Sequence, residues 1–168
     1  MEPTKPGDAA SVRDTLALAA QYREAAVKLG EASPKPTHLP VRLLALHSIE
    51  LFLNTLLLAK GLDHKAVRGL QHDFGERSRI AMGSGLVLRK RTAAHLATLS
   101  SNREYQVIRC APALTPSLSQ VNRVMAILDE VSKGAKDLGL DVVISSALRV
   151  AVDDACFVCP GCMIRGHR

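Results

Sequence analysis

The spacing of apolar residues predicts an amphipathic helix over residues 11–29. Its apolar positions recur every three or four residues and can share one face, whereas charged residues take the other face. Ser11, followed three positions later by Asp14, resembles a capping box, and Gly30 is a natural end for the helix. The predicted inner face consists of Leu16, Ala19, Ala20, Ala26 and Leu29.

A second stretch, residues 41–60, is apolar on nearly every side. Pro40 suits the first turn of a helix, and Gly61 suits its end. A helix without a wet face must be covered by neighbours on several sides, so this is predicted to be the central helix of the fold. The polar residues within it would be costly in the hydrocarbon core of a bilayer, and we therefore expect neither a membrane span nor a membrane partner.

Two aspartates organise the next part of the chain. Asp63 and Asp73 can each accept hydrogen bonds from free backbone N–H groups, so residues 61–74 are predicted to form a structured elbow, with a helix continuing to about Met82. After a pair of glycines, a basic helix is predicted over residues 89–99. Its inward residues are Ala93, Leu96 and Leu99, and its outward residues are Arg89, Lys90 and Arg91.

The last third of the chain is less regular. Residues 111–117 contain two prolines and are predicted to be a loop, within which Thr115 and Pro116 offer a start for a helix that ends near Lys136. Residues 141–154 mix β-branched residues with alanine and leucine, which fits either a helix or a short strand, and we favour a helix. The inner face of the helix before them consists of Val121, Val124, Met125, Leu128 and Val131.

These elements predict one all-α domain with loose ends. A chain of 168 residues has the size of a single domain, and because only 3% of it is aromatic its core must be aliphatic, which favours helices. We predict a disordered leader over residues 1–9, a helical bundle over 10–137 and a loosely attached C-terminal extension over 138–168. The leader is polar and broken by two prolines, so no secretory signal is recognised and a cytoplasmic location is expected.

Positive charge is concentrated in the middle of the chain. From Lys60 to Arg109 there are ten Lys or Arg residues and four Asp or Glu residues, a surplus that equals the net charge of +6 for the whole chain. Such a surface attracts phosphate groups. The alternative is the solvated face of a mildly basic protein, because the aromatic rings on which single strands stack are scarce.

The first set of candidate residues lies inside the apolar helix. His47, Glu50 and Asn54 are spaced so that they line one stripe, and buried polar groups need partners. One interpretation is an internally satisfied core network. The other is a cleft or dimer seam in which Glu50 accepts a hydrogen bond from His47 or from a ligand.

The second set lies in the elbow. It consists of Arg68, His72 and Asp73. In the simpler interpretation Asp73 caps the following helix and His72 braces the elbow against the central helix. In the alternative, His72 contacts a ligand.

The third set begins the basic helix. Arg89, Lys90 and Arg91 precede His95, which lies one turn beyond Arg91, so an anion could bridge the guanidinium and the imidazole. Two more cations and one aromatic ring could extend this set into a track for phosphate or RNA. Surface solvation is the equal competitor. The residues that would extend the track are Arg103, Tyr105 and Arg109.

The fourth set is the cysteine-rich tail. Closely spaced thiols can bind zinc as thiolates, but three cysteines in so short a span strain one tetrahedral centre. An iron–sulfur cluster would need a fourth thiolate, for which only the distant Cys110 is available. We therefore expect no cofactor, with a zinc-binding tail as the alternative. The residues of the tail set are Cys156, Cys159, Cys162 and His167.

The sequence lacks a nucleophile elbow, a Walker sequence, a dinucleotide fingerprint and an HExxH motif. The stretch HSIELFLNTLLLAKG, a short spacer and the elbow RGLQHDF together resemble the HEPN family of small helical proteins, over roughly residues 41–132. In that family an apolar helix containing a Glu, a Lys-Gly exit and a His-Asp-Leu elbow recur. Here these are Glu50, Lys60-Gly61 and His72-Asp73-Phe74.

The resemblance implies a four- to five-helix bundle, usually a homodimer. Such proteins cut RNA as toxins or serve as non-catalytic partners, beside a cognate antitoxin or a nucleotidyltransferase. Catalytic members carry Arg and His four to six residues apart, a rule that Arg42 with His47 and Arg89 with His95 both fit. On a straight helix five positions turn the chain by about 140° and six by about 240°, so a kink or a helix start would have to bring either pair together.

Arg89 with His95 is the preferred pair because it lies in the basic segment, where Arg89 would steady a phosphate and His95 would transfer a proton without a metal. The polar residue that often follows the family's arginine is Lys90 here, which departs from the pattern. The sequence therefore predicts, first, a non-catalytic binding or assembly protein for nucleic acid or nucleotides. A metal-independent endoribonuclease is the second hypothesis, and a helical dimer with a metal-binding tail is the third.

Overall fold

The computed structural model describes residues 11–32 and 39–140, which contain helices and no strand. The predicted leader at residues 1–9, the helix predicted at 141–154 and the tail set at Cys156, Cys159, Cys162 and His167 lie outside the described residues. In chain order the elements are α1 (Val12–Ala32), α2 (Leu39–Ala59), α3 (His64–Gly69), α4 (Phe74–Gly83), α5 (Lys90–Ser101), α6 (Glu104–Cys110), a 3₁₀ turn η1 (Pro112–Ser117) and α7 (Val121–Asp137). The all-α prediction is confirmed for this part of the chain.

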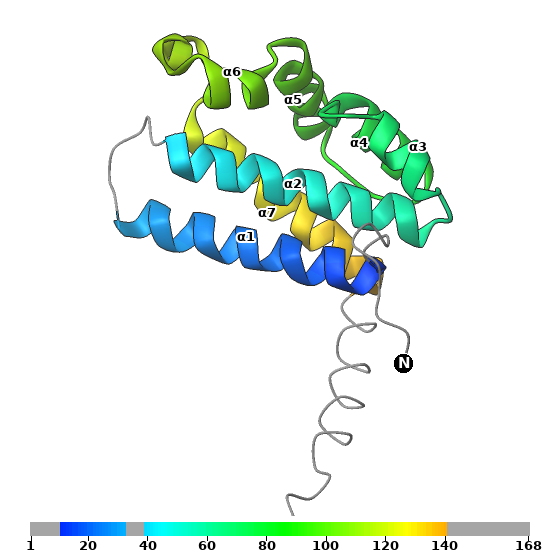
Figure 1. Ribbon diagram of the computed structural model, residues 1–168. Coiled ribbons are helices and arrows are strands. Elements are labelled where there is room, and N and C mark those ends of the chain that lie inside the picture. The colour runs from blue at the N-terminus through cyan, green and yellow to red at the C-terminus, as the bar shows by residue number, and fades with distance from the viewer. Residues whose placement is uncertain (1–10, 33–38, 141–168) are drawn as a thin grey trace, which may run out of the picture.

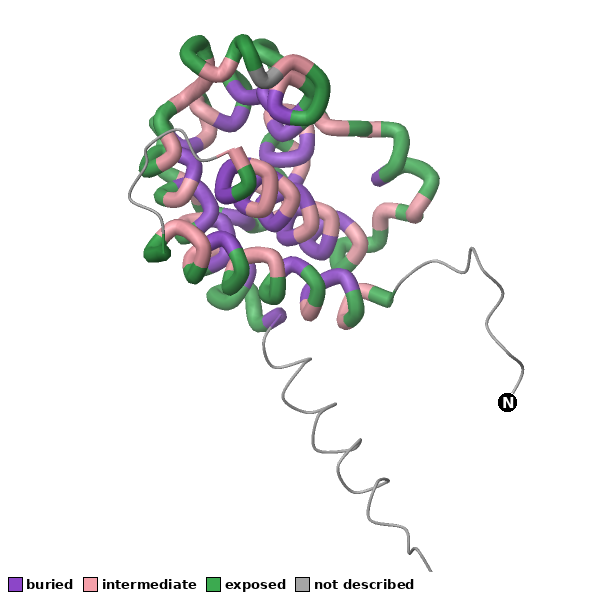
Figure 2. The backbone as a smooth tube through the Cα atoms, turned by 60° about the vertical axis from the view of Figure 1, so that its left-hand side comes forward, coloured by how far each residue is buried: buried purple, intermediate pink, exposed green. Residues whose placement is uncertain are grey.

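α2 is the central helix, as predicted. α1 runs antiparallel along it, α7 packs on another side, and α3 to α6 lie across the end and top of the molecule in the view of Figure 1. Buried residues gather where these helices face one another (Figure 2). By length and composition α2 could cross a membrane, but 67% of its most apolar window is buried inside the molecule, which is the placement of a core helix.

α1 begins where the sequence predicts but ends later. The capping box is confirmed, because the Asp14 N–H donates to the Ser11 hydroxyl while the Ser11 N–H donates to the Asp14 carboxylate. The helix does not stop at Gly30 but reaches Ala32, since a glycine inside a helix costs only about 1 kcal/mol. Ala20, predicted to face inward, is exposed, because the buried stripe is narrower than the apolar pattern.

The elbow between α2 and α4 follows the prediction closely. Gly61 has a φ of +94°, and the Leu62 N–H donates to the Leu57 carbonyl to close the end of α2. Asp63 accepts from the Ala66 N–H and begins α3, and Asp73 accepts from the Glu76 N–H and begins α4. The two short caps therefore fix where α4 starts relative to α2.

The segment after α5 differs from the prediction. α6 was not predicted, and the last helix begins at Val121 rather than at Thr115 and Pro116, which belong to η1. The physical reason is a tertiary contact. Glu104 is fully buried, accepts hydrogen bonds from the Ser119 backbone N–H and hydroxyl, and thereby ties the start of α6 to the chain just before α7.

Candidate functional site

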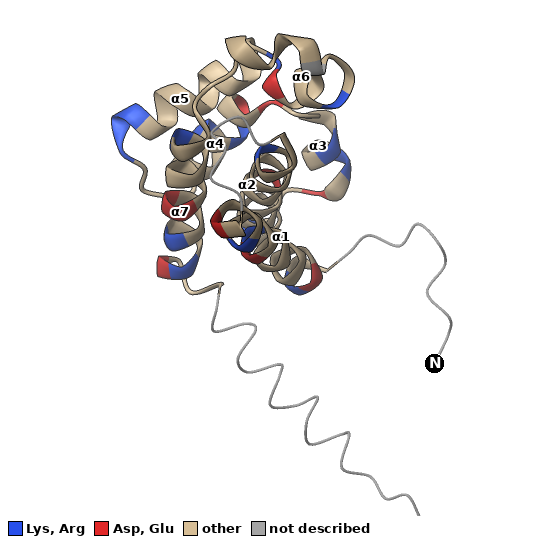
Figure 3. Cartoon of the chain, turned by 90° about the vertical axis from the view of Figure 1, so that its left-hand side faces the viewer, with Lys and Arg blue, Asp and Glu red and all other residues tan. Residues whose placement is uncertain are grey.

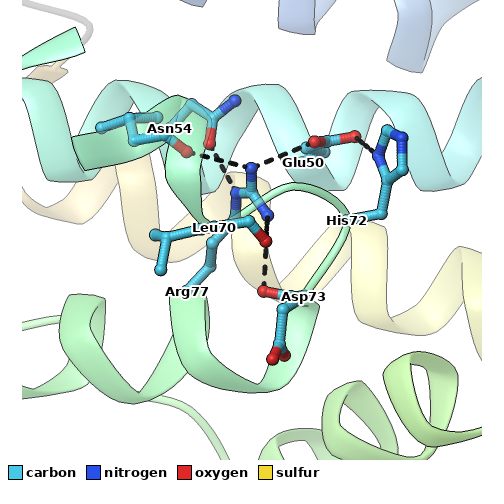
Figure 4. A network of polar contacts seen from close by, with 7 residues as sticks. Glu50, Asn54, Leu70, His72, Asp73 and Arg77 are labelled. Atoms are coloured by element: carbon cyan, nitrogen blue, oxygen red, sulfur yellow. Dashed lines mark hydrogen bonds and ion pairs between the residues drawn. The ribbon is translucent and has the colours of Figure 1, made fainter. Parts of the chain in front are cut away.

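The polar stripe of α2 meets the elbow in one buried network (Figure 4). The Glu50 carboxylate divides its two oxygens between the Nδ1 of His72, at 3.2 Å, and the Nη2 of Arg77, also at 3.2 Å. Asn54 accepts a hydrogen bond of 2.7 Å from the Nε of Arg77. Glu50 thus bonds to His72 of the elbow, and not to His47 as one alternative had it. We call Glu50, Asn54, His72 and Arg77 the elbow network.

Arg77 is the cation that balances Glu50, and the sequence analysis missed it. Its side chain is 2% exposed, and it also donates to backbone carbonyls that end α3 and begin α4. Burial lowers the pKa of this guanidinium, whereas Glu50 and Asp73 raise it. A buried glutamate in an apolar helix needs a cation, and Arg77, which follows the capping Asp73 in α4, is one of the arginines that the sequence offers for that role.

His72 also belongs to an aromatic cluster that reaches back to α1. Its ring stacks on Tyr105 of α6, with 4.0 Å between centroids and 24° between planes, and the Arg109 guanidinium lies 5.6 Å from the Tyr105 centroid. His47 meets Tyr22 edge to face at 4.5 Å. Burial, followed by the charge of Glu50, raises the pKa of Tyr105, although Arg109 opposes the change.

A cavity of about 600 Å³ opens beside this cluster. We call it the elbow cavity. Residues of the elbow form one wall, and the end of α5 with the start of α6 forms the other. Its lining includes Gln71, His72, Asp73, Ser100, Arg103, Tyr105 and Gln106.

A second concavity of about 690 Å³ lies between the start of α5 and α7. Four cationic side chains line it, and the structure adds Arg123 of α7 to the residues that the sequence had placed together. Lys and Arg residues crowd this start of α5 in Figure 3. We call it the basic pocket, and the residues that define it are Arg89, Lys90, Arg91, His95 and Arg123.

The first of these cations is held by a carboxylate. Glu130 of α7 accepts from the Arg89 backbone N–H at 2.6 Å, from the Arg89 Nε at 2.7 Å and from the Thr92 hydroxyl at 2.7 Å. Burial raises the pKa of Glu130, but these hydrogen bonds outweigh it and leave the pKa below its usual value. Arg89 is therefore neutralised, whereas Lys90, Arg91 and Arg123 make no ion pair within residues 11–32 and 39–140.

Arg89 and His95 share this pocket because a helix start separates them. Arg89 is the N-cap of α5, with an extended backbone at ψ 145°, so it lies outside the helical turn that carries His95. The Nε2 of His95 is buried and has no hydrogen-bond partner in the described part of the chain. Both residues thus line one pocket.

The remaining predicted residues lie elsewhere. Arg42 is 3% exposed and pairs with Glu104 at 3.8 Å, so it links α2 to α6 inside the molecule. Arg68 is exposed on α3 and lines neither cavity. Burial lowers the pKa of His47, whose Nδ1 finds no hydrogen-bond partner among the described residues. No group of three or more potential metal ligands occurs in residues 11–32 and 39–140.

No protein family, no curated protein and no solved structure matches this chain.

Proposed function

We propose that the protein is a non-catalytic binding or assembly protein of the HEPN type, whose basic pocket binds phosphate groups of nucleic acid or a nucleotide. One observation carries the proposal. A concave site of about 690 Å³ is lined by four cationic side chains and by no carboxylate. Within residues 11–32 and 39–140 Arg89 is the one cation of the four that makes an ion pair, which leaves Lys90, Arg91 and Arg123 to bind a ligand.

The HEPN assignment adds a four- to five-helix bundle and a homodimer to this proposal. It is supported by the way the quoted motif residues meet, since Glu50 of the apolar helix bonds to His72 and Asp73 caps the helix that carries Arg77. Light scattering on the purified protein is expected to give the mass of two chains of 18.1 kDa each. A monomer at all concentrations would contradict the dimer. A cytoplasmic antitoxin or nucleotidyltransferase remains the expected kind of protein partner.

A labelled single-stranded RNA measured by fluorescence anisotropy tests the phosphate site. The double variant Arg91→Gln/Arg123→Gln is expected to bind at least about tenfold more weakly, and its salt dependence should fall by about two phosphate contacts. The matched control Lys60→Gln/Lys65→Gln removes the same charge from exposed positions that do not line the pocket. An equal loss in both variants would show diffuse attraction and contradict the proposal.

The metal-independent endoribonuclease is a second candidate, favoured by the shared placement of Arg89 and His95. In that mechanism His95 would transfer a proton at a ribose hydroxyl while Arg89 steadied the phosphate. We place this candidate second because Glu130 holds the Arg89 guanidinium, which would have to leave that carboxylate before it could contact a phosphate. RNA decay in the presence of a chelator, compared among the natural chain, Arg89→Ala and His95→Ala, decides it. Equal decay in all three would end the nuclease hypothesis.

A further inference from the structure

The elbow cavity is walled by two residues in an unfavourable backbone conformation. Gln71 has a φ of +46° and Arg103 a φ of +49°, and within the described ranges they are the only residues other than glycine with a positive φ. Both line this one cavity, from opposite walls. A left-handed conformation is costly for a residue with a Cβ and persists where the surroundings enforce it, most often at functional sites.

His72 presents a fixed ring to the same cavity. Tyr105 covers one face of the imidazole, and Glu50 holds its Nδ1, as Figure 4 shows for the Glu50 side. The side chain is nevertheless 35% exposed. Part of the side chain is therefore accessible from the cavity that it lines, and because Tyr105 takes one face of the ring, the opposite face is the one on which a ligand can stack. A rigid ring with one open face is a platform on which a second planar ring can stack.

The rim of the cavity carries groups that can bind the edge of such a ring. Gln71 and Gln106 are exposed, and their amides offer both donors and acceptors. Arg103 adds a cation. Asp73 also lines the cavity, which disfavours a bare phosphate, because its carboxylate would repel it.

We propose that the elbow cavity binds a nucleobase, stacked on the open face of His72 and held at its edge by Gln71 and Gln106. The base belongs either to a free nucleotide or to an unpaired position of a single strand. This inference rests on the proposed function, since it supplies the base contact that the basic pocket lacks. The basic pocket includes the start of α5, at Lys90 and Arg91, and the elbow cavity includes its end, at Leu99 and Ser100.

The test is a nuclear magnetic resonance titration of the full chain with adenosine, adenosine monophosphate and inorganic phosphate, reading the His72 imidazole signals. Adenosine is expected to shift them, and inorganic phosphate is not. Tyrosine fluorescence is a second readout, because the chain has two tyrosines and no tryptophan. A short single-stranded RNA in a further arm identifies the source: shifts with the strand indicate unpaired bases, and shifts with the monophosphate alone indicate a free nucleotide.

Variants separate stacking from structure. His72→Phe keeps a flat ring and should retain adenosine binding, whereas His72→Ala should weaken it at least about fivefold. Gln106→Ala lies on the exposed surface of α6, leaves the elbow network intact and should also weaken binding. The inference is overturned if about 10 mM adenosine leaves the His72 signals of the natural chain unmoved, or if His72→Ala and Gln106→Ala both bind as the natural chain does.

The two proposals fail separately. Arg91→Gln/Arg123→Gln should leave adenosine binding unchanged, because neither residue lines the elbow cavity. If that variant binds adenosine normally and loses no RNA affinity, the proposed phosphate site alone is contradicted. If that variant binds RNA more weakly, but adenosine does not shift the His72 signals of the natural chain, the proposed base site alone is contradicted.

Discussion

Arg77 joins α4 to α2 through more contacts than any other residue of the elbow network. Its guanidinium meets Glu50, Asn54 and three backbone carbonyls, and almost none of it reaches solvent. A buried pair of this kind is costly to break on one side, because the partner is left charged and unpaired. The residue therefore determines whether the elbow stays on the central helix.

Replacing Arg77 by methionine should lower the free energy of unfolding by about 3–5 kcal/mol, because the buried Glu50 carboxylate would lose its arginine and keep only the contact with His72. Urea denaturation measures this. The matched control is Arg79→Met, two positions along. Its side chain is exposed and pairs with Glu76 on the surface, so this change should cost less than about 1 kcal/mol. Similar losses in both variants would show that the network adds no more than a surface pair.

The lowered pKa of His47 predicts how the stability of the fold depends on pH. Burial, with smaller effects from His72 and Arg109, lowers its pKa in the folded protein, while Glu50 opposes this. The unfolded chain then binds a proton more readily than the folded chain, so stability is retained above the ordinary pKa of about 6.5 and lost as pH falls below it. His47→Phe keeps a ring against Tyr22 and should flatten this loss between about pH 7 and 5 in thermal melts. An unchanged pH profile would contradict it.

At the scale of elements, α4 and α5 pack closely at one glycine. A Cβ on Gly75 would lie 3.1 Å from the Cα of Ala97 and 3.3 Å from the Oδ1 of Asp73, so it would press on backbone and on the cap of α4 together. Gly75→Ala should therefore destabilise the protein by about 1–3 kcal/mol in denaturant unfolding. Gly83→Ala, in the same helix with open space around it, is the control and should be neutral or stabilising. The opposite order would show that helix propensity decides both positions.

The sequence predicts elements well where the signal is local. The capping box of α1, the caps at Asp63 and Asp73, and the basic helix each depend on a few neighbouring residues, and the structure confirms them. α6 has seven residues, too few for a clear period, and its start is fixed by the contact of Glu104 with Ser119. Such a contact between distant residues leaves no trace in periodicity, which is why the start of α7 was also misplaced.

At the scale of the whole molecule, the sites too depend partly on neighbouring residues and partly on contacts between distant parts of the chain. Arg89 to His95 belong to one stretch of chain and could be grouped from sequence, but Arg123 joins their pocket only because α7 packs beside α5. Glu50, His72 and Tyr105 were each singled out in separate sets. Their meeting requires the elbow and α6 to fold over α2, and the spacing of residues along the chain does not contain that information.

The negative charge of Glu130 beside the basic pocket leads to one more prediction. Glu130→Gln would remove the negative charge beside the pocket and free Arg89, so RNA affinity measured by anisotropy should rise about threefold to tenfold. Stability should fall by about 1–2 kcal/mol, since the start of α5 loses strong acceptors. Glu31→Gln, the same change in charge at an exposed position of α1 that lines neither named cavity, is the control and should alter affinity less than about twofold. Equal gains would place the RNA elsewhere.

The Glu50 carboxylate serves two partners that differ in their access to solvent. One oxygen bonds to an arginine sealed in the interior, and the other to an imidazole that a molecule from outside can touch. A ligand that contacts the imidazole therefore also affects the packing of α4 against α2, because both contacts share the Glu50 carboxylate. Binding of a ligand at His72 should therefore change the melting temperature, so a thermal-shift screen can identify what this protein binds.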